Sequence, residues 1–538
     1  MNIFKIILII GIVINIGTQT FAQRYEAEAA SLSGDASKAS NAARSGGAYV
    51  QLKGGALTMP VNIEEEGYYN ISINAASTGG KKINGFVING SSVDFTLDQT
   101  SYTDITLVFG LKLKKGEHQI GIKNSWGWIN IDFFEFTKVE QGERFKINKS
   151  LVTPNATPQA QKLYDFLYDN YGEKIISGVM THRSMDEILW LQSKTGKKPA
   201  LIGIDFLFCG RNYSWYDEDE PVNDARNYYN LNGIPAFAWH WRDPSRKTEE
   251  FYTDKTNFDI NAVFSPESDD YKAMIADIDY ISQFLLQLQT DSVAALWRPL
   301  HEAAGGWFWW GAKGPEPCKA LWQLMYDRMV NHNGVRNLIW VWTREPNDDA
   351  WYPGDEYVDI VGRDIYKDGD HSSQILEFNQ MNALYGGNKM LAISECGSFP
   401  DPDTLVDDEA AWSFFMPWNG DFVRDEYYNP ISLWKKALTH DYVLTLDEMP
   451  DLRNYEKQKT NNVYQIGSAT KVFPTQINNL INISKAEAIG QMRIFNSNGQ
   501  IVLEAFSIAP NYTINTSILP KGIYYLQVSG NEVFKIIK

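Results

Sequence analysis

The chain has 538 residues, which is too long for one ordinary domain, so about three domains are expected. Its formal net charge of −17 excludes the basic surface that a nucleic-acid partner requires, and it suits a secreted protein with a neutral substrate. The 17 Trp residues are many, and their flat faces can either stack on the C–H faces of sugar rings or fill a large aromatic core.

Residues 1–23 have the pattern of a secretory signal. Lys5 gives a weak positive start, residues 6–16 are apolar, and small residues precede Gln23, so we expect cleavage near Ala22 or Gln23. The apolar run is short for a membrane span, and no other run is long enough to cross a bilayer. Three Cys residues allow at most one disulfide, so packing must supply the stability.

Residues 24–138 are predicted to form a β-sandwich. Short alternating runs such as 69–75 and 85–90 are separated by Gly, Asn and Lys-Gly turns. Glu26 and Glu28 open this region and Asp132 lies near its end. On adjacent strands these carboxylates could hold Ca²⁺ through oxygen ligands, and three solvated carboxylates are the alternative.

Three motifs give this region a more specific identity. They are 25–28 (YEAE), 46–50 (GGAYV) and 126–132 (WGWINID), and together they resemble carbohydrate-binding module family 35. The resemblance implies a sandwich that binds plant polysaccharide. It also implies Ca²⁺ on Glu26, Glu28 and Asp132, and sugar contacts from Asn124 and Trp126. Tyr49 is a weaker candidate that could equally be core.

After a polar linker at 139–157, strands and helices alternate over residues 158–453. The predicted strands are 174–180, 199–206, 234–241, 294–301, 338–342, 358–365, 390–395 and 412–418. Helices are expected at 159–171, 186–194, 271–289 and 319–332. Eight β-then-α units predict a (β/α)₈ TIM barrel. A doubly wound open sheet is the alternative, but it usually brings a Gly-rich phosphate turn, and none is present in the sequence.

Polar and aromatic residues stand at the ends of these strands, where the active site of such a barrel forms. They are Asp205, His240, Glu302, Trp342, Asp364, Tyr366, Glu395 and Trp418. Glycoside hydrolysis needs one protonated and one ionised carboxyl group on either side of the scissile bond. Desolvation among Trp rings would raise the pKa of Glu302, whereas Arg298 and Tyr366 could keep Glu395 ionised.

The motifs 297–302 (WRPLHE), 306–311 (GWFWWG), 362–366 (GRDIY) and 393–397 (ISECG) resemble glycoside hydrolase family 26, in clan A of the barrel-fold hydrolases. The resemblance implies a retaining enzyme in which Glu302 is the acid/base and Glu395 the nucleophile. In that mechanism the two carboxyl groups lie about 5–5.5 Å apart.

The same resemblance implies further roles around these two residues. His240 and His301 would contact the sugar that becomes covalently bound, and Trp418 would lie beneath that sugar. Tyr366 would orient Glu395, and Asp364 and Arg298 would support the site. Trp307 would face the leaving group. A core position is the alternative for His240. Trp309, Trp310 and Trp340 are expected in packing roles, and Cys396 is expected to be a buried thiol.

A metal site is a competing interpretation, because His182 follows the first barrel strand and Asp205 ends the second. The chain has only seven His residues and no paired metal-binding motif, so we expect no catalytic metal or other cofactor.

Residues 473–538 are predicted to form a small β domain after a linker at 454–472. The segment 496–499 (NSNG) is typical of a hairpin turn. The region resembles the C-terminal sorting domain of the type IX secretion system, although 473–475 (FPT) stands where Pro-Asn-Pro is usual. This implies export through that secretion machinery, to the medium or the outer cell surface.

The sequence therefore predicts a secreted, monomeric, retaining endo-β-1,4-mannanase that hydrolyses mannan, galactomannan or glucomannan by double displacement. A β-1,3-1,4-glucanase or β-1,3-xylanase of the same family remains an alternative, because one sequence does not reveal the hydroxyl contacts of the pocket. A non-catalytic glycan-binding surface protein is the alternative from another class.

Overall fold

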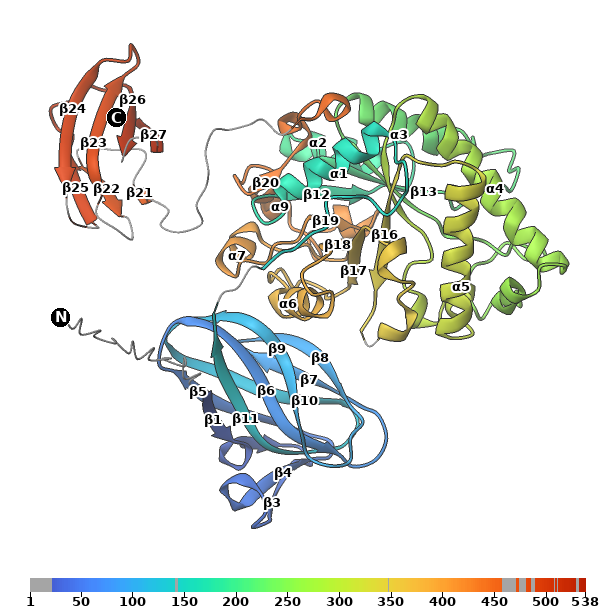
Figure 1. The fold of residues 1–538 in the computed structure, drawn as a ribbon, viewed down its shortest axis with the longest axis horizontal. Helices are drawn as coiled ribbons and strands as arrows, with labels where there is room; N and C mark the ends of the chain where they lie inside the picture. Colours follow the sequence, from blue (N-terminus) through green and yellow to red (C-terminus); the bar gives the residue numbers. More distant parts are fainter. Residues whose placement is uncertain are drawn as a thin grey trace, which may run out of the picture. The chain divides into compact units, whose positions relative to one another are not determined.

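The computed structural model describes residues 22–140, 144–346, 348–456, 471–473, 480–484, 489–507, 509, 511–528 and 532–538. The chain divides into two compact units, Met1–Lys457 and Gln458–Lys538 (Figure 1). The predicted signal up to residue 21 lies outside the described residues, as do 141–143 of the first predicted linker and 457–470 of the second.

The N-terminal part of the first unit is a sandwich of two antiparallel sheets, as predicted. Its strands are β1 (Ala22–Glu26), β2 (Ser31–Ser33), β3 (Ser37–Ser40), β4 (Ala48–Leu52), β5 (Ala56–Ile63), β6 (Gly67–Ser77), β7 (Lys82–Ile88), β8 (Ser91–Leu97), β9 (Thr103–Leu113), β10 (Gly116–Trp126) and β11 (Ile129–Val139). One sheet has the order β3-β4-β11-β6-β9 with β1 on β11, and the other β2-β5-β10-β7-β8. Alternate residues of β5 are buried, which is the pattern that a two-layer core requires.

The rest of this unit is a closed barrel of eight parallel strands, which confirms the predicted TIM fold (Figure 1). The strands are β12 (Ile175–Met180), β13 (Leu201–Asp205), β14 (Ile234–Ala238), β15 (Ala295–Arg298), β16 (Leu338–Arg344), β17 (Ile360–Ile365), β18 (Met390–Cys396) and β19 (Phe414–Pro417). Pairing of β12 with both β13 and β19 closes the ring, and β20 (Val443–Leu444) adds to β12.

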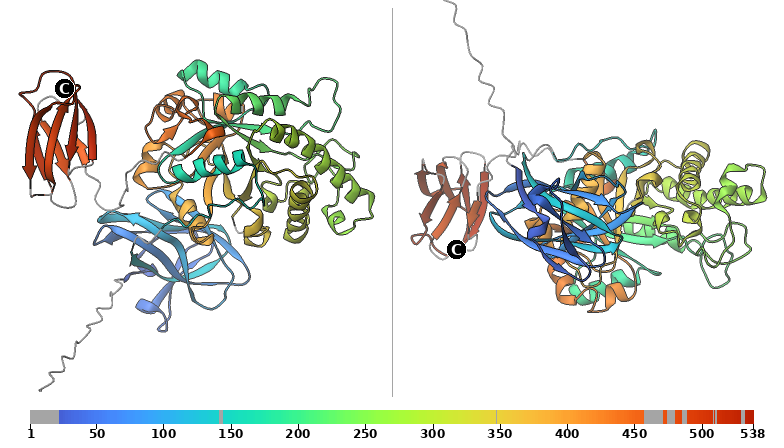
Figure 2. Two further views of the ribbon diagram at one scale, coloured as in Figure 1. Left: turned by 45° about the horizontal axis from the view of Figure 1, so that its top comes forward. Right: turned by 90° about the horizontal axis from the view of Figure 1, so that it is seen from below.

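Helices surround the strands on the outside of the barrel (Figure 2). They are α1 (Pro158–Asn170), α2 (Asp186–Thr195), α3 (Glu220–Asn230), α4 (Asp269–Thr290), α5 (Pro315–Tyr326), α6 (Ile375–Leu384), α7 (Pro402–Asp407), α8 (Asp421–Arg424) and α9 (Ile431–Ala437). The predicted helix at 319–332 is α5 followed by a π-helical turn at Asp327–His332. No helix in the described part of the chain is long and apolar enough to cross a membrane.

The second unit consists of two small antiparallel sheets. One contains β21 (Lys471–Phe473), β22 (Leu480–Ser484) and β25 (Asn511–Asn515), and the other contains β23 (Gly490–Asn496), β24 (Ile501–Ser507), β26 (Ile523–Val528) and β27 (Glu532–Ile537). The predicted hairpin is confirmed, because β23 and β24 pair across a turn in which Gly499 has a φ of 78°. Buried residues such as Ile494 and Leu526 form a core separate from that of the first unit.

Candidate active site

A cleft of about 550 Å³ lies at the carboxyl ends of the barrel strands. Its lining consists of His240, Tyr252, His301, Glu302, Trp307, Phe308, Glu345, Arg363, Asp364, Tyr366, Glu395, Trp418 and Phe422. The predicted catalytic and sugar-contacting residues of the barrel all line this cleft except Arg298, which lies buried next to it. Asp205 and Trp342, also expected at strand ends, are not part of its lining.

The two candidate catalytic carboxyl groups face each other across the cleft. One oxygen each of Glu302, Asp364 and Glu395 lies within 4.8 Å of the other two. A separation this short fits the spacing of about 5–5.5 Å in retaining glycosidases better than the roughly 6.5–9.5 Å of inverting ones.

Arg298, the last residue of β15, holds two of these carboxylates in place. Its Nη1 donates to Asp364 Oδ2 at 2.8 Å, and its Nη2 donates to Glu395 Oε2 at 2.5 Å. Burial lowers the pKa of the guanidinium, but the charges of Asp364 and Glu395 raise it above its usual value. The group therefore stays charged, and it neutralises part of the negative charge beneath the cleft.

Glu395 lines the cleft with little of its side chain exposed, and burial raises the pKa of its carboxyl group. The Arg298 charge and a hydrogen bond from the Tyr366 hydroxyl to Glu395 Oε1 both oppose that rise. The ring of Tyr366 remains partly exposed in the cleft. Since Arg298 pairs directly with Glu395, the negative charge of the Glu302–Glu395 pair rests on Glu395.

Glu302 lies beyond the end of β15 in a strained turn, with φ values of 49° at Leu300 and 52° at Glu302. Burial, followed by the charges of Asp364 and Glu395, raises the pKa of Glu302 to about 9. The indole Nε1 of Trp307 donates to Glu302 Oε2 at 2.9 Å, and the ring is 43% exposed. A side chain at Gly305 would meet this ring at 2.1 Å, so glycine is needed for the close approach. Glu302 is thus built to remain protonated.

Asp205 orients His240, which forms a pair with His301 in the lining of the cleft. It accepts from the backbone N–H of His240 at 3.0 Å and lies 2.6 Å from His240 Nδ1. His240 Nε2 lies 3.2 Å from His301 Nε2. Burial lowers the pKa of His301 well below its usual value, so this ring stays neutral. Of the two residues in the metal alternative, Asp205 pairs with His240, and the backbone N–H of His182 donates to Glu187 Oε2 at 3.0 Å.

Sequence reasoning missed five cleft residues: Tyr252, Phe308, Glu345, Arg363 and Phe422. Glu345 and Phe308 could have been found, because the first directly follows β16 and the second lies within the aromatic motif after Glu302. Tyr252 lies on a connection whose path the sequence does not reveal, and Phe422 lies in the short helix α8, which the sequence did not predict. Trp309, Trp310, Trp340 and Cys396 are buried, as expected, and Trp342 is buried as well.

In the module, the three predicted Ca²⁺ ligands approach one short turn. The Ser45 hydroxyl donates to Glu26 Oε1 at 2.7 Å, and the Ser45 N–H donates to Asp132 Oδ2 at 3.3 Å. A Cβ at Gly46 would meet Glu28 Oε1 at 2.1 Å. Burial raises the pKa of Asp132, and Arg44 lies 3.7 Å from its Oδ2.

The predicted sugar contacts of the module, Asn124 and Trp126, end strand β10, and their side chains lie outside the described residues. Tyr49 packs edge-on against Tyr102 and is half-buried. Trp128, which the sequence analysis did not single out, is 54% exposed directly before β11.

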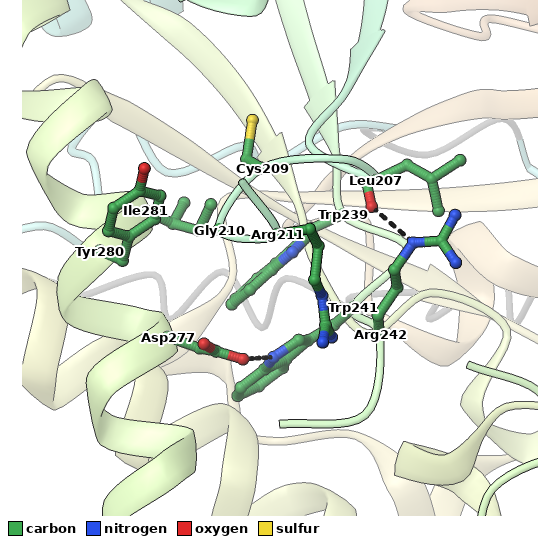
Figure 3. A pocket seen from close by; sticks show the side chains of 10 residues that line it. All are labelled: Leu207, Cys209, Gly210, Arg211, Trp239, Trp241, Arg242, Asp277, Tyr280 and Ile281. Atoms are coloured by element: carbon green, nitrogen blue, oxygen red, sulfur yellow. Dashed lines mark hydrogen bonds between the residues drawn. The ribbon is translucent and has the colours of Figure 1, made fainter. Parts of the chain in front are cut away.

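A second cavity lies between the loop after β13 and α4 (Figure 3). Its volume of about 10 Å³ has room for one water molecule. Figure 3 shows the Trp241 indole bonded to Asp277 and the Arg242 Nε bonded to the Leu207 carbonyl, at 2.8 and 3.0 Å. This space is too small for a sugar.

Three family models match the chain. Glycosyl hydrolase family 26 matches residues 152–448, carbohydrate binding module (family 35) matches 23–139, and the secretion system C-terminal sorting domain matches 471–538. The sorting domain marks the chain as a secreted protein.

Similar proteins and structures agree with these matches. A mannan endo-1,4-β-mannosidase of Thermothelomyces thermophilus is 37% identical, over 80% of this chain and 91% of the relative. Mannan endo-1,4-β-mannosidase B of Piromyces sp. is 36% identical, over 82% of this chain and 80% of the relative. The crystal structure of a Podospora anserina GH26-CBM35 β-(1,4)-mannanase is 36% identical, over 80% of this chain and 99% of that one, with a TM-score of 0.56.

The conclusion rests on the carboxyl groups that meet at one end of the barrel, on the match to the family model and on the similar proteins. The chain belongs to glycosyl hydrolase family 26 and is a glycoside hydrolase that carries a family 35 carbohydrate-binding module and a C-terminal secretion sorting domain.

Proposed function

We propose that this enzyme is a retaining endo-β-1,4-mannanase that cleaves mannan, galactomannan or glucomannan. The observation that carries the proposal is the pair Glu302 and Glu395, whose carboxyl oxygens lie within 4.8 Å in unequal environments. The names of the similar mannan endo-1,4-β-mannosidases support the substrate class.

In the first step, Glu395 attacks the anomeric carbon while Glu302 gives its proton to the departing glycosidic oxygen. This step forms a glycosyl ester on Glu395 and releases the leaving-group sugar. In the second step, Glu302, now ionised, takes a proton from water, whose oxygen displaces Glu395 from the anomeric carbon. Two inversions give net retention, and both residues return to their starting protonation states.

The surrounding residues prepare this reaction. Arg298 and the Tyr366 hydroxyl hold Glu395 and favour its ionised form. Burial and the charges of Asp364 and Glu395 keep Glu302 protonated. His240, set by Asp205, and His301 would contact the sugar that becomes covalently bound, Trp418 would lie beneath it, and Trp307 would face the leaving group.

The assignment of the two glutamates is tested by Glu302→Ala and Glu395→Ala. Both variants should lose at least 10³-fold in turnover of mannan, an order of magnitude taken from the removal of catalytic groups. With an aryl β-mannobioside whose leaving group needs no proton, Glu302→Ala should still release a burst of phenol, whereas Glu395→Ala should release none. Near-full activity of either variant on mannan, or an inverted product anomer by NMR, would refute the assignment.

Substrate choice within the family needs a separate measurement. Reducing-sugar release on mannan, lichenan and β-1,3-xylan should be greatest on mannan, and chain-length analysis should show internal cleavage. Activity confined to the other two polymers would favour the glucanase or xylanase alternative.

All the residues that line the cleft come from one barrel, so we propose that the enzyme acts as a monomer.

We also propose that the module holds Ca²⁺ on Glu26, Glu28 and Asp132 and keeps the enzyme near its polymer. The proposal is supported by three buried carboxylate oxygens without a hydrogen-bond partner, Glu26 Oε2, Glu28 Oε2 and Asp132 Oδ1. Chelation should lower the melting temperature of the wild-type chain, and added Ca²⁺ should restore it. Asp132→Asn should lower the Ca²⁺ response, and an unchanged melting temperature after chelation of the wild type would refute the site.

A further inference from the structure

The cleft has an ion pair to which the proposed reaction gives no role. Glu345 directly follows β16, Arg363 lies on β17, and both side chains line the cleft. They are only 15% and 10% exposed. Burying two charges costs more free energy than their attraction commonly returns, so an ion pair in the wall of a substrate cleft needs a reason beyond stability.

The geometry of the pair leaves the carboxylate able to bind something else. Both oxygens of Glu345 lie 3.2 Å from the same nitrogen, Arg363 Nη1, which also donates to the Asp364 carbonyl at 2.7 Å. This is not the two-nitrogen fork of a fully engaged arginine–carboxylate pair. A carboxylate can accept about four hydrogen bonds. Within the described residues no other donor reaches these oxygens.

Arg363 is itself incompletely paired, which argues against a purely structural role. Its Nε is buried without a hydrogen-bond partner, and the nearest carboxylate to it, that of Glu377, is 3.8 Å away. An ion pair retained for stability alone would be expected to use its donors fully, because an unsatisfied buried donor costs free energy.

The order of strands places Glu345 on the side of the proton donor. Glu302 follows β15, Glu345 follows the neighbouring strand β16, and Glu395 lies on β18, two strands further on. The charge of Glu345 contributes to raising the pKa of Glu302. His240 follows β14 and Trp418 follows β19, which are the strands outside the β15–β18 stretch, and the centroids of their rings lie 5.5 Å apart. Because a proton donor faces the leaving group, the position of Glu345 on the strand next to that of Glu302 favours a contact on the leaving-group side.

We propose that Glu345, held in place by Arg363, accepts hydrogen bonds from the hydroxyl groups of the leaving-group sugar and determines specificity there. This inference rests on the proposed function. Neighbouring hydroxyl groups of a pyranose can donate together to the two oxygens of one carboxylate. A leaving group without such hydroxyls would cover the remaining acceptor positions of the two Glu345 oxygens without giving them a hydrogen bond, and discrimination of this kind is strong.

The test compares two substrates with the same glycone and different leaving groups: a manno-oligosaccharide and an aryl β-mannobioside. For Glu345→Gln and Glu345→Ala in the full chain, the ratio of kcat/KM for the oligosaccharide to kcat/KM for the aryl substrate should fall about tenfold or more. Transfer of the bound glycosyl group to a manno-oligosaccharide acceptor should fall relative to transfer to water, because the acceptor occupies the same position.

Glu356→Gln is the matched control, since Glu356 is an exposed carboxylate on the same β16–β17 connection and does not line the cleft. It should leave both the substrate ratio and the acceptor use at the wild-type values. If Glu345→Ala does not fold, the isosteric Glu345→Gln still reports the ratio.

The inference would be overturned if folded Glu345→Gln kept both the kcat/KM ratio of the two substrates and the transfer to the acceptor within twofold of wild type. The ion pair would then have only a structural role. Failure of the proposed function gives a different result, because the wild-type chain would then not cleave mannan. The same ratio would in that case be measured on oligosaccharides of whichever β-glycan it does cleave.

Discussion

At the scale of single residues, the protonation of Glu302 determines how the enzyme responds to pH. Its pKa is raised to about 9, first by burial and then by the charges of Asp364 and Glu395. A general acid works only while it holds its proton, and kcat/KM reports the free enzyme. We therefore expect kcat/KM for manno-oligosaccharides to fall as the pH rises through about 9, as measured from initial rates between pH 5 and 10.5.

An aryl glycoside whose leaving group needs no protonation is the control for this prediction. With that substrate the fall should move to higher pH or vanish, because formation of the glycosyl ester no longer requires the Glu302 proton. An identical alkaline limb for the two substrates would show that another group, or unfolding, causes the loss of activity.

The residues of the site were predictable to the extent that they lie at or just beyond strand ends. Glu302, Asp364 and Glu395 follow apolar runs, and a barrel brings such ends together. Glu345 is also close to a strand end, but the predicted strand stopped at Trp342, two residues before β16 ends. Asp205 was expected at a strand end, but its pairing with His240 depends on the register of neighbouring strands, which the sequence does not reveal.

At the scale of secondary structure elements, β17 and β18 must approach closely for the site to form. A Cβ at Gly362 would lie 2.2 Å from Ser394 Oγ, so only glycine leaves room for this hydroxyl. Ser394 Oγ donates to Asp364 Oδ1 at 2.7 Å, and Asp364 in turn accepts from Arg298. A glycine on one strand thus sets the position of a carboxylate beside the nucleophile.

Gly362→Ala should destabilise the protein by about 1–3 kcal/mol through overpacking and should lower kcat by displacing Ser394 and Asp364. Thermal unfolding and turnover of mannan are the measurements. In Gly362→Ala/Ser394→Gly the steric conflict is removed, so at least half of the lost stability should return while kcat stays low. If the double variant is no more stable than the single one, the contact between the two strands is not the cause.

The barrel strands were predictable because fully buried strands appear as short apolar runs between turns. Their ends were less predictable: the eighth strand, expected at 412–418, is only Phe414–Pro417. The helix expected to reach residue 332 changes at Asp327 into a π-helical turn, which hydrophobic periodicity does not distinguish from a continuing helix.

At the scale of the whole molecule, the module packs on the barrel within the first unit instead of being joined to it only by a linker. Glu409, which follows α7, accepts from the Tyr68 hydroxyl of β6 at 2.9 Å and from Lys112 Nζ of β9 at 2.6 Å. Arg144, in the segment between the two domains, lies 3.7 Å from the same carboxylate. Elsewhere Gln380 of α6 donates to the Asp94 carbonyl of β8 at 3.3 Å.

Because several donors converge on one carboxylate, Glu409→Ala should loosen the contact more than the loss of an isolated surface ion pair would, by about 1–2 kcal/mol. Scanning calorimetry of the full chain should then show the module melting separately at a lower temperature, with the barrel transition retained. Lys138→Ala breaks an exposed ion pair with Glu65 inside the module and is the control, with no expected change in melting. The difference in module melting temperature between wild type and Glu409→Ala should become smaller at high salt, because screening weakens the same contacts in the wild-type chain. A Glu409→Ala chain that unfolds as the control does at low salt would mean that the contacts of α6 with β8 and β9, and not this carboxylate, join the two domains.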